Sequence, residues 1–337
     1  MISEILSCFV FFTNFFRASK DEDWLKNEGW DLIKSSCQFF ASRVSCLDED
    51  ITDIHQCSNF TFWNVQPPDE SAGVVNSSVF TNAAAGKLLE WGTKLSQKIE
   101  GVNQPFWMWI SSHMYIPLDY ELYSGGVVHP EYDGYEGDPI NQADVILLQY
   151  PLYWPMTTEI KINDLLYYED LTSSPDSARS FYTGDSSISI AYLRLGGDEF
   201  QKKGDDEFLQ AFDHMDSSSF YIWQETLDGG HLNFLTGAGG FLQNVLFGYG
   251  GLDLEDHEGG MVVNPLLPPN TSFMKLRNIQ YGSNFLSIGW DDQDSMTIEN
   301  VCTSKTTISI IFQQNKEGYK IEPCQKFETT VQKFLIK

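Results

Sequence analysis

Basic residues are scarce in this chain of 337 residues, which carries 21 Lys and Arg against 47 Asp and Glu and has a net charge of −26. A field of this sign repels the phosphates of nucleic acids and the headgroups of anionic lipids. The apolar stretch over residues 6–16 is shorter than the roughly 20 residues that a membrane-spanning helix needs. We therefore expect neither nucleic acid nor a membrane as a partner.

Metal-binding patterns are also absent, since no two of the six cysteines have the Cys-x-x-Cys spacing of a structural zinc site. The acidic residues within 120–138 do not match a calcium-binding loop, and this segment is expected to be a loop over a site or a solvated loop. We expect neither a metal nor a cofactor. Two disulfides are open possibilities in an oxidising compartment, namely Cys46 with Cys57 and Cys302 with Cys324.

The stretch over residues 6–16 is expected to form a buried helix, with the core of a signal peptide as the alternative. We accordingly expect a cytoplasmic location in preference to a secreted or lysosomal one. A chain of this length with 42% hydrophobic residues can bury a large core and divide into two domains. Its aromatic content of 14% would suit stacking on sugar rings, but it would equally suit core packing.

Hydrophobic periodicity predicts a mainly helical region followed by a β region. Apolar residues recur at helical spacing over 24–44, 81–99, 187–195 and 206–215. After about residue 258 the pattern changes to short alternating strands over 285–288, 296–298 and 306–312. We therefore predict a helical domain over 1–257 and a small antiparallel β-sandwich over 258–337.

Two glutamates lie in long motifs that are the strongest functional signal of the chain. Glu70 ends Pro-Pro-Asp-Glu at 67–70, and Glu225 ends Ile-Trp-Gln-Glu at 222–225. An inverting glycosidase needs one carboxylic acid to protonate the leaving oxygen and one carboxylate to activate water. The alternative for Glu70 is a structural acid near a helix N-terminus.

These motifs resemble glycoside hydrolase family 65, together with Val-Asn-Ser-Ser-Val-Phe-Thr-Asn at 75–82, Asn-Gln-Ala-Asp-Val at 141–145 and Asn-Phe-Leu-Thr-Gly at 233–237. Within the family the chain resembles the acid-trehalase-like branch that removes glucose from glucosyl-galactosyl-hydroxylysine. The resemblance covers nearly the whole chain and implies the latter half of an α/α toroid, a six-hairpin barrel, followed by a C-terminal sandwich. The family's N-terminal sandwich and early barrel helices have no counterpart here, so we expect exposed apolar edges, and a truncated gene model stays open.

The resemblance implies a role for each site residue. Glu70 matches the general acid, and burial among Phe62, Trp63 and Pro68 is expected to raise its pKa. Glu225 matches the general base. Gln142 matches a glucose-binding residue, and Asn141 stands beside it where the family usually has Lys. Ser71 and Ala72 replace a Tyr-His pair that usually follows the acid.

The implied function is that of an inverting exo-α-glucosidase acting on glucosyl-galactosyl-hydroxylysine of collagen-type glycans. Phosphorolysis is disfavoured because the family's phosphorylases lack the sequence at 233–237. The glycines at 237–240 have no phosphate-loop Lys after them and are expected to permit close helix packing. A catalytically inactive or truncated relative that binds glycans is the alternative, and an acid trehalase is a further one.

Overall fold

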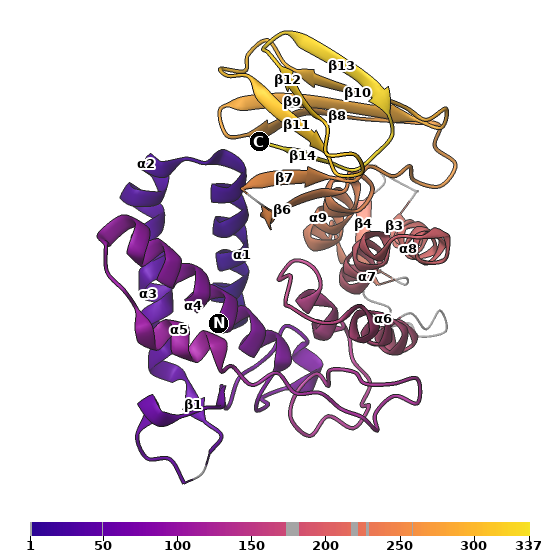
Figure 1. Ribbon diagram of the computed structural model, residues 1–337. Helices are drawn as coiled ribbons and strands as arrows, with labels where there is room; N and C mark the ends of the chain where they lie inside the picture. Colours follow the sequence, from indigo (N-terminus) through magenta and orange to yellow (C-terminus); the bar gives the residue numbers. More distant parts are fainter. Residues whose placement is uncertain (1, 49, 173–181, 217–221, 227–228, 258) are drawn as a thin grey trace. The chain divides into compact units, whose positions relative to one another are not determined.

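The computed structural model describes residues 2–48, 50–172, 182–216, 222–226, 229–257 and 259–337 (Figure 1). The chain forms two compact units. The first consists of Met1–Phe12, Glu22–Gly184 and Thr226–Asp228, and the second of Thr13–Asp21, Asp185–Glu225 and Gly229–Lys337. The sequence-based boundary between residues 257 and 258 stays a prediction.

The first unit is mainly helical. Its helical elements include α2 (Glu22–Trp24), the π-helical turn η1 (Leu25–Gly29), α3 (Trp30–Arg43), α4 (Val79–Glu100), α5 (Pro105–Ser112) and α6 (Thr158–Thr172), together with α1 (Ile2–Ser19) as far as Phe12. The helices predicted over 6–16, 24–44 and 81–99 are confirmed, the second of them running through η1 into α3. None of the helices in the described ranges combines the length and the apolar character that crossing a membrane requires.

Helix α4 shows how the sequence fixes the bounds of an element. Ser78 caps its N-terminus by accepting a hydrogen bond from the Thr81 N–H at 3.3 Å, and Gly101 ends it in the left-handed region with φ +68°. Helix α4 packs against α3. At Gly92 an added methyl group would overlap with the Cys37 sulfur, so only glycine fits there.

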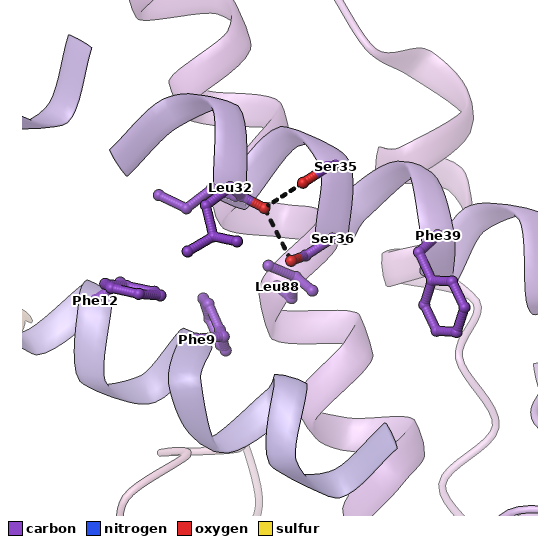
Figure 2. A pocket seen from close by; sticks show the side chains of 8 residues that line it. Phe9, Phe12, Leu32, Ser35, Ser36, Phe39 and Leu88 are labelled. Atoms are coloured by element: carbon purple, nitrogen blue, oxygen red, sulfur yellow. Dashed lines mark hydrogen bonds between the residues drawn. The ribbon is translucent and has the colours of Figure 1, made fainter. Parts of the chain in front are cut away.

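An apolar cavity of about 370 Å³ lies where α1, α3 and α4 meet (Figure 2). Phe9 and Phe12 come from α1, and Leu32 and Phe39 come from α3. The hydroxyls of Ser35 and Ser36 also line it, but both donate to the Leu32 carbonyl at 2.9 Å and offer little to a polar ligand. Phe11 is 65% exposed, so α1 is buried along one face only.

Irregular chain fills most of the first unit between α5 and α6. The segment 120–138 is a loop, as predicted, and it is anchored by a bridge between Asp119 and Val128. The apolar residues that follow Ala143 form a 3-10 helix, η4 (Asp144–Leu148). Near β1 (Ser45–Cys46) and β2 (Phe60–Thr61), Cys46 and Cys57 form a disulfide.

The second unit begins with helices. It contains α7 (Tyr182–Leu195) from residue 185 on, α8 (Asp198–Gln210), α9 (Leu235–Gln243), η5 (Asn244–Tyr249) and a sheet of β3 (Met215–Asp216), β4 (Ile222–Thr226) and β5 (Gly229–Leu232). The helix predicted over 187–195 lies within α7. The helix predicted over 206–215 was placed too late in the chain, because α8 begins at Asp198 and ends at Gln210.

Two antiparallel sheets form the C-terminal part of the second unit. One has the order β13-β10-β9-β8 and the other the order β12-β11-β14-β7-β6. Their bounds are β6 (Leu252–His257), β7 (Gly260–Val263), β8 (Phe273–Tyr281), β9 (Asn284–Asp291), β10 (Ser295–Asn300), β11 (Ile308–Phe312), β12 (Gly318–Ile321), β13 (Gln325–Thr330) and β14 (Phe334–Ile336). Trp290, Ile298 and Phe312 belong to one buried cluster with residues of both sheets. The alternating strands read from the sequence are therefore present, and Cys302 forms a disulfide with Cys324.

Candidate active site

Glu70 lies in a short 3-10 turn, η3 (Glu70–Ala72). Asp69 caps this turn, because its carboxylate accepts hydrogen bonds from the Ser71 N–H at 3.1 Å and from the Ser71 hydroxyl at 2.8 Å. Gly73 ends the turn with φ +68°, a left-handed conformation that glycine adopts without steric cost. Ser71, which departs from the family pattern, thus helps to hold the turn that carries Glu70.

The side chain of Glu70 is exposed, whereas that of Asp69 is buried. The expectation that Glu70 is buried among Phe62, Trp63 and Pro68 is therefore wrong. Trp63 is itself exposed, and the tight turn directs Asp69 inward and the next residue outward. The buried carboxyl group at this place in the sequence is that of Asp69.

Asn141 and Gln142 lie beside the Glu70 turn. The Asn141 N–H donates to both carboxylate oxygens of Asp69 at 3.4 Å, and the Gln142 side-chain amide donates to Oδ1 of Asp144 at 3.4 Å. Oδ2 of Asp144 in turn accepts the Asp69 N–H at 2.9 Å. The first unit thus brings together three of the four predicted site residues, Glu70, Asn141 and Gln142.

Three buried carboxyl groups belong to this arrangement. Asp69, Glu131 and Asp144 are 2%, 3% and 1% exposed. Burial raises the pKa of Glu131 well above its usual value, and the nearby charges of Asp144 and Asp69 raise it further. Burial likewise raises the pKa of Asp144, against the lowering effect of the Asp69 N–H that it accepts. Both Glu131 and Asp144 therefore favour the protonated form more strongly than they would in water.

Helix α6 holds the segment that carries Glu131 through contacts with His129. The His129 N–H donates to Oδ1 of Asp164 at 2.9 Å, and the imidazole Nδ1 lies 2.8 Å from Oδ2. The Tyr168 hydroxyl donates to the His129 carbonyl at 2.7 Å. Burial raises the pKa of Asp164, while the hydrogen bond and charge of His129 lower it. Asp164 and Tyr168 both lie on helix α6, which therefore fixes the backbone at His129, two residues before Glu131.

Sequence reasoning did not identify Glu131. It lies in the segment 120–138 that was interpreted only as a loop, and its partners come from distant parts of the chain. The one local signal is the apolar pair Val127 and Val128 shortly before it, which marks a segment turned inward. Asp144 belongs to the motif at 141–145, but the sequence offers no reason to assign it a role of its own.

Glu225 lies on β4 in the second unit and is half-buried. Its Oε2 accepts the His231 N–H at 3.1 Å, and the His231 Nε2 lies 3.8 Å from the same oxygen. The Phe234 N–H donates to the Trp223 carbonyl at 2.8 Å, and the Trp223 ring packs on Phe241 with centroids 5.0 Å apart. The motifs at 222–225 and 233–237 are therefore neighbours within this unit.

The glycines that follow this motif differ in their surroundings. A methyl group at Gly240 would lie 2.7 Å from the Ser186 hydroxyl, so the predicted close helix packing is confirmed at this position. A methyl group at Gly239 would meet no atom within 4 Å. Close packing therefore explains one of the two glycines and not the other.

The two predicted catalytic carboxylates belong to different units, Glu70 to the first and Glu225 to the second. Each is held by its own local contacts, and their roles as acid and base stay predictions. Within the described ranges, the group of side chains close enough together to share a metal ion consists of Cys46, Asp48 and Cys57. Two of these three are joined in a disulfide, which leaves them without the thiolates that a metal would bind.

Comparison with known proteins gives clear relatives, although no family model matches the chain. A protein-glucosylgalactosylhydroxylysine glucosidase of Dictyostelium discoideum is 36% identical over 282 residues, which are 83% of this chain and 37% of that protein. Its counterpart in Danio rerio is 35% identical over 80% of this chain and 38% of that protein. A kojibiose hydrolase of Flavobacterium johnsoniae is 31% identical over 79% of this chain and 36% of that protein.

Over most of its length the chain is therefore homologous to glycosidases like those of glycoside hydrolase family 65. A solved structure described as a putative kojibiose phosphorylase from the human microbiome has the same fold, with a TM-score of 0.69 and 19% identity over 97% of this chain and 46% of that one. The family fold of helices followed by antiparallel sheets is thus present. The chain spans less than half the length of these family 65 relatives.

Proposed function

We propose that this chain contributes the acid and base of an inverting exo-α-glucosidase that removes terminal glucose from glucosyl-galactosyl-hydroxylysine. The observation that carries the proposal is its 36% identity, over 83% of its length, to a glucosidase named for that substrate. A carbohydrate partner follows from the same relationship. Within the family fold, the helices of the chain would form the latter half of an α/α toroid.

In the proposed mechanism Glu70 protonates the glycosidic oxygen, and Glu225 removes a proton from the water that attacks the opposite face of the sugar. Inverting enzymes keep these two carboxyl groups about 6.5–9.5 Å apart to leave room for the water. Asn141 and Gln142 would hold hydroxyls of the terminal glucose, because both are half-buried and lie beside the Glu70 turn. An amide offers both a donor and an acceptor to a hydroxyl.

The test is glucose release from glucosyl-galactosyl-hydroxylysine by the 337-residue chain and by its Glu70→Gln variant. Glu28→Gln is the matched control, because Glu28 is exposed on η1 and has no place in the proposed chemistry. We expect Glu70→Gln to lower kcat about 100- to 10,000-fold, the range that general acid–base catalysis typically contributes. Equal turnover by Glu70→Gln and Glu28→Gln would refute the role of Glu70.

The same assay includes trehalose and kojibiose. Because relatives named acid trehalase and kojibiose hydrolase are 29% and 31% identical to this chain, each disaccharide represents a related specificity. We expect the highest kcat/KM for glucosyl-galactosyl-hydroxylysine. A higher value for either disaccharide would reassign the substrate without changing the reaction class.

A second candidate function is glycan binding without hydrolysis. It is favoured by the exposure of Glu70 and by Asn141 in place of the family's Lys, which removes a charged donor. Calorimetry with glucosyl-galactosyl-hydroxylysine separates the two functions. Measurable binding without glucose release would support this second function, and turnover would exclude it.

A further inference from the structure

Asp144 joins the two segments that carry Glu70 and Gln142. One oxygen of its carboxyl group accepts the Asp69 N–H at 2.9 Å, and the other accepts the Gln142 amide at 3.4 Å. Asp69 is the residue directly before Glu70, so the first contact fixes the backbone where the Glu70 turn begins. Asp144 is itself fixed, because it opens the 3-10 helix η4 and is fully buried.

Asp69 in turn holds the conformation of the Glu70 turn. Its carboxylate caps the turn through Ser71 and also accepts the Asn141 N–H at 3.4 Å. Asp144 accepts the Asp69 N–H, and Asp69 accepts the Asn141 N–H. The two aspartates thus hold the Glu70 turn and the segment before Asp144 together. A shift of Asp144 would therefore move the Glu70 turn and the Asn141–Gln142 segment together.

Glu131 completes the arrangement. The charges of Asp144 and Asp69 act on it, and Tyr132, Tyr135, Tyr167 and Tyr168 are among the other titratable groups near it. Its Oε1 is buried and has no hydrogen-bond partner among the described residues. Burial raises the pKa of both Glu131 and Asp144, which favours their neutral forms. An amide at position 144 would keep the acceptor for Asp69 and imitate the neutral acid.

We propose that Asp144 is a positioning residue, which sets the place of Glu70 through the Asp69 N–H and the place of Gln142 through its amide. The inference rests on the proposed glucosidase function. Asp144 touches no substrate in this account, and its effect on turnover is exerted through the two segments that it joins.

The experiment compares Asp144→Ala with Asp144→Asn in the full chain, with Asp164→Ala as a matched control. Asp164 is also buried and also accepts a main-chain N–H at 2.9 Å, but that donor belongs to His129. We expect Asp144→Ala to lower kcat about 100-fold, because a displacement of about 1 Å can cost that much. Asp144→Asn should lower kcat by no more than about tenfold, because its single carbonyl oxygen keeps the acceptor for the Asp69 N–H and loses only the acceptor for the Gln142 amide. Asp164→Ala should lower the melting temperature but lower kcat at least about tenfold less than Asp144→Ala does, because both contacts of Asp144 stay in place.

Amide hydrogen exchange of residues 69–73 gives a second readout that does not need turnover. Asp144→Ala should speed the exchange of the Asp69 N–H and of the turn amides, and neither Asp144→Asn nor Asp164→Ala should do so. If the unaltered chain releases no glucose, this pattern upholds the positioning role while the proposed function fails. The positioning role is overturned if exchange over 69–73 is unchanged in Asp144→Ala. Asp144→Asn serves as the second variant in case Asp144→Ala does not fold. Faster exchange of these amides in Asp144→Asn would also overturn the positioning role.

Discussion

The imidazole Nδ1 of His129 lies 2.8 Å from Oδ2 of Asp164, and the main-chain N–H of the same histidine donates to Oδ1 at 2.9 Å. Both side chains are buried. One aspartate on α6 thus holds both the backbone and the side chain of the loop that leads to Glu131. A helix and an irregular segment are joined here by two hydrogen bonds to one buried carboxyl group.

This pair predicts a large loss of stability on truncation of Asp164. Asp164→Ala leaves a buried N–H and a buried imidazole without an acceptor, and such losses cost about 3–5 kcal/mol in total. Asp164→Asn keeps the acceptor for the N–H and should cost less. Urea unfolding followed by circular dichroism measures both variants. Equal stability of Asp164→Ala and the unaltered chain would show that the pair does not anchor the loop.

The buried carboxyl cluster predicts that stability depends on pH. The folded-state pKa of Glu131 lies above its unfolded value, so the favourable contribution is fully present below the unfolded pKa of about 4.3 and is lost as pH rises through the folded pKa. Glu131→Gln cannot ionise and should be more stable than the unaltered chain at pH 8, with the advantage shrinking toward pH 4. Thermal melting across this range measures the effect.

Glu136→Gln is the control for this pH prediction, since Glu136 is exposed in the same loop. Its melting curves should follow those of the unaltered chain at every pH. If Glu131→Gln also followed them, the raised pKa of Glu131 would have no effect on the stability of the fold.

The contact between α3 and α4 gives a packing prediction. Gly92→Ala would push a methyl group into the Cys37 sulfur, and overpacking of this kind costs about 1–3 kcal/mol. Gly239→Ala in α9 meets no atom within 4 Å and should be neutral or stabilising by up to about 1 kcal/mol. The two unfolding free energies are compared with that of the unaltered chain. A neutral Gly92→Ala would mean that α3 and α4 can separate without cost.

Periodicity predicted the right type of element where apolar residues recur at the period of a helix or a strand. The stripe over 81–99 and the alternation over 306–312 both gave the right type of element, because a one-sided core contact imposes its period on the sequence. The helix predicted over 206–215 failed for a local reason. Gly204 in the middle of α8 reads as a breaker, but it allows close approach to α7, where an added methyl group would lie 2.8 Å from Leu193.

The site was only partly readable from the sequence. The motifs located Glu70, Asn141, Gln142 and Glu225, but they could not show that Asp69 is buried while Glu70 is exposed. That difference arises from a three-residue turn, which is too short to produce a periodic pattern of apolar residues in the sequence. Glu131 was missed because a buried acid in an irregular segment has no local pattern, and its partners are set by the tertiary fold.

The most direct test of the account is the anomer of the released glucose, followed by proton NMR while the chain acts on glucosyl-galactosyl-hydroxylysine. An inverting acid and base pair made of Glu70 and Glu225 predicts β-glucose as the first product from the α-linked substrate. Both Glu70→Gln and Glu225→Gln should abolish the signal, and Glu28→Gln should not. Release of α-glucose first, or no release at all by the unaltered chain, would contradict the account.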